Sequence, residues 1–408
     1  MTFRAYDHDR DIDAVLRIYR EVGWVSETSH EDAVKPLLKS GRGRVVEMNG
    51  SAECLAFANA GTIRYLETDL PLSAVDSVAT SRIARKQGLA RQLTAQLVAE
   101  EASRGFALSI LGIFEQGYYN QLGFGNGAYE RWYSFDPAML QLPVSARTPV
   151  RLGKEDWQQV HASRLNRRRT HGSCSLLEPE TTRADVFWGD QRFGLGYADD
   201  NGQITHHLWC SSEGEQGPYS VKWMVYQSKK QFLELMALIQ SLGDQVHSIE
   251  FQEPPGVQLQ DLVRQPIKMR SITEHSPHEN RMTALSYWQA RILNLEACLA
   301  ATKLTRESTR FNLVLTDPVT SLLPASSTWK GIAGEYTITL GPTSMAEPIT
   351  RNELPTMHAS VNAFTRLWLG VRSPTALSWT DNLQAPESLL KTLDSVMRLP
   401  TPMPDWDF

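Results

Sequence analysis

The spacing of apolar residues in the first 113 residues predicts a helix, a run of strands, a second helix and a further strand. Helical spacing of three or four positions occurs first in Ile12, Val15, Leu16 and Tyr19. Apolar and β-branched runs predict strands over 44–48, 54–58, 72–80 and 107–113. Before the last strand, a second helix is indicated by Leu89, Leu93 and Leu97.

The loop before the second helix is cationic and has a glycine where the helix should begin. It contains Arg85, Lys86 and Gly88. A helix N-terminus offers unpaired backbone N–H groups and the positive end of the helix dipole, and a glycine there lets a phosphate approach the backbone. The loop therefore predicts a phosphate-binding helix start, although a short basic loop alone is more often solvated surface.

A second segment carries a tyrosine in the order Tyr119-Asn120-Gln121-Leu122-Gly123-Phe124. With the pattern Arg85-x-x-Gly88-x-Ala90, this segment resembles the two signatures of GNAT-type N-acyltransferases. An isolated tyrosine would be an ordinary core residue, but here both signatures occur in order and at suitable spacing. The resemblance implies that acetyl-CoA is bound by Val78, Ala79, Thr80, Arg85, Lys86, Gln87, Gly88, Leu89, Ala90 and Asn120.

Residues 143–284 show the pattern of a second unit of the same kind, set off by Pro143 and Pro149. Helices are expected over 155–169 and 229–242, with strands over 192–197, 203–210, 219–226 and 246–251. This unit lacks the Arg-x-x-Gly-x-Gly/Ala loop. It is therefore predicted to be a degenerate GNAT module that does not hold coenzyme A.

Residues 285–408 form a third predicted unit, which starts around 288–299. Strand-like runs at 311–315 and 336–340 precede two helices, one through Phe364 and one through Leu393. This mixed layout resembles a sterol-carrier-type fold. The apolar faces of its helices are expected to be core rather than the wall of a lipid tunnel.

The whole chain resembles the enhanced-intracellular-survival family of aminoglycoside N-acetyltransferases. The resemblance implies an α/β (α+β) fold with a catalytic GNAT domain (1–142), a degenerate one (143–284) and a sterol-carrier-like domain (285–408). It also implies a hexamer in which the C-terminal residue reaches the first domain's active site. The site residues implied are Tyr119 as general acid, the Phe408 carboxylate as base, and Trp24, Glu27 and Asp407 at the acceptor. Asp405 would add negative potential.

The composition agrees with a soluble globular enzyme. The chain has 408 residues, 41% hydrophobic and 21% charged, with a formal net charge of −5. No signal-peptide-like or membrane-length apolar run is seen, so we expect a cytoplasmic protein without a membrane partner. The negative charge argues against nucleic-acid binding and permits a cationic substrate. Neither a metal site nor a disulfide is signalled by Cys54, Cys174, Cys210 and Cys298.

We therefore predict an N-acetyltransferase that moves an acetyl group from acetyl-CoA to a primary amine of a cationic small molecule, such as an aminoglycoside or a polyamine. A backbone N–H near 78–80 would stabilise the oxyanion, and Tyr119 would protonate the thiolate. An α-carboxylate has a pKa of roughly 3.5, so Phe408 serves as base only if burial raises that pKa or a water relays the proton. The alternative is a non-catalytic protein that binds coenzyme A or a hydrophobic ligand. The acceptor and the length of the acyl group stay open.

Overall fold

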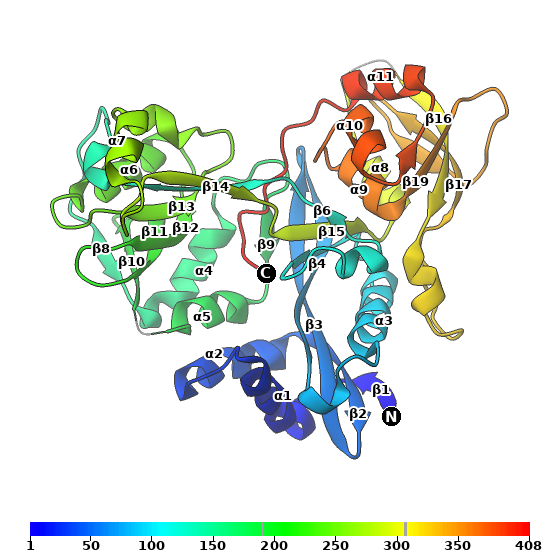
Figure 1. Ribbon diagram of the computed structural model, residues 1–408, viewed down its shortest axis with the longest axis horizontal. Coiled ribbons are helices and arrows are strands. Elements are labelled where there is room, and N and C mark those ends of the chain that lie inside the picture. The colour runs from blue at the N-terminus through cyan, green and yellow to red at the C-terminus, as the bar shows by residue number, and fades with distance from the viewer. Residues whose placement is uncertain (190, 306–307) are drawn as a thin grey trace.

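The computed structural model describes residues 1–189, 191–305 and 308–408, which fold into three units (Figure 1). Figure 1 shows the blue first unit at the centre and bottom, the green second unit at the left and the orange third unit at the upper right. From the third unit a red strap, residues 398–408, returns to the centre, where the C-terminus lies between the other two units. The predicted mixed α/β fold is confirmed.

The first unit is built on an eight-stranded sheet in the order β1-β2-β3-β4-β5-β15-β6, with β9 paired to β3. Its strands are β1 (Thr2–Ala5), β2 (Arg42–Met48), β3 (Ser51–Tyr65), β4 (Thr68–Thr80), β5 (Leu108–Gly112), β6 (Gly125–Asn126), β9 (Cys174–Leu176) and β15 (Trp288–Ile292). Its helices are α1 (His8–Val22), α2 (Thr28–Ser40), α3 (Leu89–Ser103) and the short turns η1 (Arg82–Ala84) and η2 (Tyr119–Leu122). The predicted first helix is α1, which is capped by the Asp7 side chain and ends at Gly23 with a φ of 81°.

The second unit has a seven-stranded sheet in the order β14-β7-β13-β12-β11-β10-β8. Its strands are β7 (Glu130–Phe135), β8 (Val150–Leu152), β10 (Arg192–Ala198), β11 (Ile204–Ser212), β12 (Tyr219–Val225), β13 (Ile249–Gln252) and β14 (Arg281–Leu285). Its helices are α4 (Trp157–Leu165), α5 (Pro179–Phe187), α6 (Lys229–Ser241), α7 (Pro266–Thr273), η3 (Pro137–Met139), η4 (Lys154–Asp156) and η5 (Leu259–Leu262). The order β12, α6, β13, with the two strands parallel, repeats the order β4, α3, β5 of the first unit.

The third unit has a five-stranded mixed sheet in the order β18-β17-β16-β19-β20. Its strands are β16 (Thr309–Thr316), β17 (Gly334–Leu340), β18 (Met345–Glu347), β19 (Thr356–Ser360) and β20 (Leu383–Gln384). Its helices are α8 (Leu295–Ala300), η6 (Pro318–Leu322), α9 (Val361–Trp368), α10 (Pro374–Thr380) and α11 (Glu387–Val396).

Strand pairing crosses the predicted domain limits at three places. β7 lies before residue 142 in the chain but belongs to the second sheet, and β9 lies after it but pairs with β3 of the first. β15, expected to open the third unit, lies between β5 and β6 in the first sheet. All five residues of β15 are buried, so it is a central strand covered on both faces.

The first sheet and the third unit share one continuous hydrophobic core. Tyr65 at the end of β3 stacks on Trp368 of α9 with ring centroids 4.1 Å apart, and its hydroxyl donates to the Trp368 carbonyl at 3.1 Å. Phe364 and Leu393, on the helix faces predicted to be core, are buried in this cluster. The third unit is therefore packed firmly against the sheet that carries the candidate site.

Within the described ranges, no helix is long and apolar enough to cross a bilayer. The four cysteines are buried free thiols. The same residues contain no group of three His, Cys, Asp or Glu side chains placed to hold a metal ion.

Candidate active site

Two strands of the first sheet separate where the chain approaches the basic loop. β4 and β5 pair in parallel only from Leu72 to Val75. Beyond that point Ala56 of β3 faces both Ser77 and Val78, and Ser77 has a φ of 55°. This is a β-bulge, which bends β4 away from β5 and opens a wedge between them. The segment predicted to supply an oxyanion-binding N–H lies along one side of this wedge.

α3 begins at this wedge with an open N-terminus. Its N-cap is Gly88, with a φ of 73° and no side-chain cap, and a Cβ there would meet no atom within 4 Å. A pocket of about 760 Å³, here called the loop pocket, lies in front of it. Of the predicted cofactor residues, the pocket is lined by Val78, Ala79, Thr80, Arg85, Lys86, Gly88, Leu89 and Ala90.

Two predicted cofactor residues do not line the loop pocket. The Gln87 side chain donates to the Ile83 carbonyl at 3.2 Å. Asn120 accepts from the Gly117 N–H at 2.9 Å and donates to the Phe124 carbonyl at 2.9 Å. Both side-chain amides therefore hold their own loops in place. The position of a residue in a sequence motif does not reveal whether its side chain binds a ligand or stabilises the loop.

Tyr119 lies on η2, 4% exposed, beneath Tyr118 and Phe114, which line the loop pocket. Burial raises the pKa of its phenol well above the ordinary range, and the Asp76 carboxylate and, when it ionises, the Tyr118 phenol act in the same direction. Such a phenol keeps its proton at neutral pH, as a general acid requires.

The turn that carries Tyr119 is held by residues far away in the sequence. The Asn362 amide of α9 donates to the carbonyls of Asn120 (2.9 Å) and Phe124 (2.8 Å). Arg291 of β15 donates to the Leu122 carbonyl and forms a fully buried ion pair with Asp317 at 2.7 Å. The third unit and β15 thus set the position of the phenol.

The C-terminus reaches the wedge from the other side, and it is not a frayed tail. A Cβ built on Gly112, the last residue of β5, would lie 2.8 Å from the Phe408 main-chain oxygen, so a glycine is needed for this approach. A second pocket of about 460 Å³, the tail pocket, is lined by Trp406, Asp407 and Phe408. Trp24 lines both pockets, so they adjoin at its side chain.

The tail pocket is acidic. Besides the chain end, it is lined by the carboxylates of Asp76, Asp185 and Asp407, with Arg192 among them. Asp185 is paired with Arg164 at 2.8 Å. Desolvation raises the pKa values of Asp76 and Asp407, and the negative charge of Asp185 acts in the same direction on both. Asp76 is half-buried, and Asp407 is exposed.

The sequence-based acceptor residues are only partly assembled by the fold. Trp24 and Asp407 line the tail pocket, whereas Glu27 does not and accepts from the Ser29 hydroxyl at 3.4 Å. Asp405 is neutralised by Arg167. The sequence analysis did not identify Asp76 as a site residue, although a carboxylate within an otherwise apolar strand could have indicated one. Asp185, Trp188 and Arg192 gave no signal, because only the packing of the second unit brings them here.

A third cavity, about 720 Å³, continues past Asp407 and Phe408 to Glu130 at the start of β7. Burial raises the pKa of Glu130 to about 7, and the negative charge of Asp407 adds to this rise. The backbone N–H of Tyr287 and the Gln252 amide, each at 3.2 Å, oppose it.

We expect Glu130 to make the protein less stable as the pH rises towards 7. A folded-state pKa above the unfolded value of 4.5 means that the stabilising contribution is complete below about pH 4.5 and is lost as the pH rises through about 7. The melting temperatures of wild type and Glu130→Gln at pH 5 and pH 8 measure this effect. From pH 5 to pH 8, the melting temperature of wild type should fall more than that of Glu130→Gln. Glu213→Gln, at an exposed position, is the control. Equal losses in wild type and Glu130→Gln would contradict the expectation.

Comparisons with known proteins bear on the family of the first unit and on the fold of the whole chain. Residues 3–127 match the family described as acetyltransferase (GNAT) domain. No curated protein sequence matches the chain. Among solved structures, a probable N-acyltransferase from Enterococcus faecalis has a TM-score of 0.79 at 17% identity, covering 100% of this chain and 99% of its own.

Two further structures are similar over their whole length. A GCN5-related N-acetyltransferase from Anabaena variabilis has a TM-score of 0.79 at 16% identity, and Eis1 from Mycobacterium abscessus has 0.76 at 16% identity, each with 100% of both chains covered. At these identities the likeness establishes the fold, whereas the family match bears on the activity. Residues 3–127 are therefore an acetyltransferase domain of the GNAT type, and the protein that carries this domain is an acyltransferase.

Proposed function

We propose that the protein transfers an acetyl group from acetyl-CoA to a primary amine of a cationic small molecule, such as an aminoglycoside or a polyamine. The observation that carries this proposal is the adjacency of two pockets at Trp24: a basic one at a helix start and an acidic one that contains the chain's own C-terminus. Donor and acceptor would meet between them.

The loop pocket fits the pyrophosphate of acetyl-CoA. The open N-terminus of α3 offers N–H groups and positive potential, and Gly88 leaves free space there. In the second unit, α6 follows β12 after only three residues (226–228), against eight (81–88) in the first unit. The N-terminus of α6 is capped by the Ser228 hydroxyl, which accepts from the Gln231 N–H. This difference supports the proposal that the second module is degenerate.

The tail pocket fits an ammonium group. Asp76, Asp407 and the Phe408 carboxylate line it, and partly enclosed carboxylates attract and orient a cation more strongly than solvated ones do. Trp24 and Trp188 add aromatic faces, which suit cations and amphipathic rings.

The proposed reaction balances with these groups. A substrate ammonium gives a proton to the terminal carboxylate or, through water, to solvent, and the neutral amine attacks the thioester carbon. The oxyanion is stabilised by a backbone N–H of the bulged segment 78–80. The C–S bond then breaks, and the thiolate takes the proton of Tyr119. The nitrogen of the new amide gives up its second proton, directly or through water, to the Tyr119 phenolate, which restores the phenol.

We extend the proposal to the chain's relatives and assembly. In this proposal, the protein is an enhanced-intracellular-survival-type enzyme whose third unit is sterol-carrier-like. It is active in the cytoplasm as a homo-oligomer of six copies. Full-length similarity to Eis1 supports the first part. α7, which buries none of its residues and leaves Ile267 78% exposed, supports an interface between copies. Light scattering on purified protein tests the copy number.

The decisive experiment measures thiol release from acetyl-CoA with a panel of amines. Aminoglycosides and polyamines should be acetylated, whereas neutral monoamines should react slowly, because they lack the charges that the acidic pocket binds. Mass spectrometry identifies the product. Faster reaction with neutral amines than with any polycation would overturn the cationic acceptor.

An Asp76→Asn variant sharpens this experiment. Removing the carboxylate should raise KM for polycationic amines by about tenfold, the worth of one partly buried charge contact of about 1.4 kcal/mol, and leave KM for acetyl-CoA unchanged. Asp13→Asn, at an exposed position of α1, is the matched control. An unchanged KM for polycations would remove Asp76 from the acceptor site.

We expect Gly88→Asp to weaken acetyl-CoA binding by at least about tenfold, because a carboxylate at this helix start repels the pyrophosphate. Isothermal calorimetry measures the affinity. Gly88→Asn is the control, since asparagine has the same shape, tolerates the left-handed backbone and carries no charge. An unchanged affinity in folded Gly88→Asp protein, or an equal loss in both variants, would contradict the assignment.

A further inference from the structure

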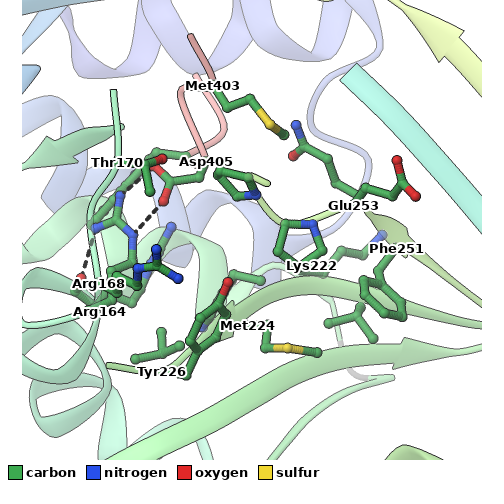
Figure 2. A pocket seen from close by; sticks show the side chains of 18 of the residues that line it. Arg164, Arg168, Thr170, Lys222, Met224, Tyr226, Phe251, Glu253, Met403 and Asp405 are labelled. Atoms are coloured by element: carbon green, nitrogen blue, oxygen red, sulfur yellow. Dashed lines mark hydrogen bonds and ion pairs between the residues drawn. The ribbon is translucent and has the colours of Figure 1, made fainter. Parts of the chain in front are cut away.

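The second unit keeps the wedge of a GNAT module although it has lost the phosphate-binding loop. β12 and β13 pair in parallel only at Tyr219 and Ser220, and then diverge. A cavity lies between them, lined by Met224 of β12 and Phe251 of β13. Figure 2 shows Met403 and Asp405 of the strap on one side of this cavity, and Met224 and Tyr226 on the other. The strap thus lies over the wedge between β12 and β13, which corresponds to the wedge between β4 and β5 in the first unit.

Charged contacts join the strap to the end of α4 and the residues that follow it. The Arg167 guanidinium forms a fork with the Asp405 carboxylate, with Nε to Oδ2 at 3.0 Å and Nη2 to Oδ1 at 2.7 Å. A planar fork of this kind sets the orientation of both groups.

Trp406 is held by a second arginine. The Arg164 guanidinium lies 3.8 Å from the centroid of the Trp406 ring and 4.2 Å from that of Trp223, which in turn stacks on Trp209. Arg164 is 3% exposed and Trp406 6%. A buried guanidinium loses its hydration, and here two aromatic faces and Asp185 replace the lost water.

Backbone contacts give the strap its register. The Cys174 N–H donates to the Pro404 carbonyl at 2.7 Å, and the Met403 N–H donates to the His171 carbonyl at 3.2 Å. A Cβ on Gly172 would lie 2.5 Å from the Met403 nitrogen, so this position admits only glycine. Two residues beyond Trp406, the chain ends beside Gly112.

We propose that the wedge of the degenerate module is a binding site for the chain's own C-terminal peptide, residues 402–408, and that Arg164 and Arg167 are the positioning residues that place the Phe408 carboxylate in the tail pocket. The catalytic consequence rests on the proposed function, whereas the binding of the peptide does not. The module that lost coenzyme A thereby completes the active site of its neighbour.

The test uses the full-length protein and carboxypeptidase A, which removes an aromatic C-terminal residue once the chain end leaves its site. Phenylalanine release from wild type should be slow. In Arg167→Ala, which lacks the fork, it should be at least about tenfold faster, and in Arg167→Lys, which keeps the charge and loses the fork, it should be intermediate. Arg151→Ala, at an exposed position of β8, should behave as wild type.

Kinetics on intact protein give the second readout. Arg167→Ala should lower kcat for the amine and leave KM for acetyl-CoA unchanged, with Arg167→Lys again intermediate. Phenylalanine release at the wild-type rate from both Arg167 variants would overturn the peptide site. Absence of transfer by wild type to every amine would instead overturn the proposed function, and the release rates would still decide the peptide site.

Discussion

Fusing a short tag after Phe408 should lower acetyl transfer by about a thousandfold, within the range measured for positioned acid–base groups. The tag removes the free carboxylate from the position beside Gly112 and fills the tail pocket with added chain. Deleting Phe408 alone should have a similar effect, because the new carboxylate lies one residue, about 3.5 Å, short of the wedge. Turnover with acetyl-CoA and a reactive amine measures both.

The control is the same tag at the N-terminus, which lies at the far end of the first sheet in Figure 1. N-tagged protein should be fully active. A larger deletion, of residues 406–408, is a poorer test, because Trp406 is part of the hydrophobic core and its loss also lowers stability. Equal turnover of N-tagged, C-tagged and Phe408-deleted proteins with matched melting temperatures would exclude the terminal carboxylate as base or anchor.

Tyr119→Phe should lower kcat on the order of a hundredfold while acetyl-CoA binding stays nearly intact. The phenol is buried and protonated, and losing its hydroxyl removes a proton donor without changing the packing of the ring. Steady-state kinetics with calorimetric affinity for acetyl-CoA separates the two effects.

Tyr118 is the competing phenol, since it lines the loop pocket and burial raises its pKa to about 12. A larger loss of kcat in Tyr118→Phe than in Tyr119→Phe would transfer the role of acid to Tyr118. Tyr129→Phe, at a 56% exposed position, controls for the substitution itself. Wild-type turnover in Tyr119→Phe would make Tyr119 a core residue only.

Local patterns predicted the parts of the site that depend on neighbours in the chain. Helical spacing indicated α1 and α3, and the glycine after a basic loop marked the open start of α3. The bulge at Ser77 could not be predicted from the sequence, because it arises from the pairing of two strands. Between two paired positions, β4 has two residues where β3 has only one. Gln87 and Glu27 were assigned by position in a motif, and the structure shows their side chains outside both pockets.

The sequence by itself determined the mixed α/β architecture, the basic start of α3 and the position of the turn that carries Tyr119, because each depends on residues within one or two elements. The tertiary structure alone decided that β15 enters the first sheet, that Asp76 and Asp185 face one pocket, and that Arg164 and Arg167 hold the strap. These contacts join residues more than a hundred positions apart. Their pairing depends on complementary burial, charge and shape in the folded chain, which no local period of apolar residues encodes.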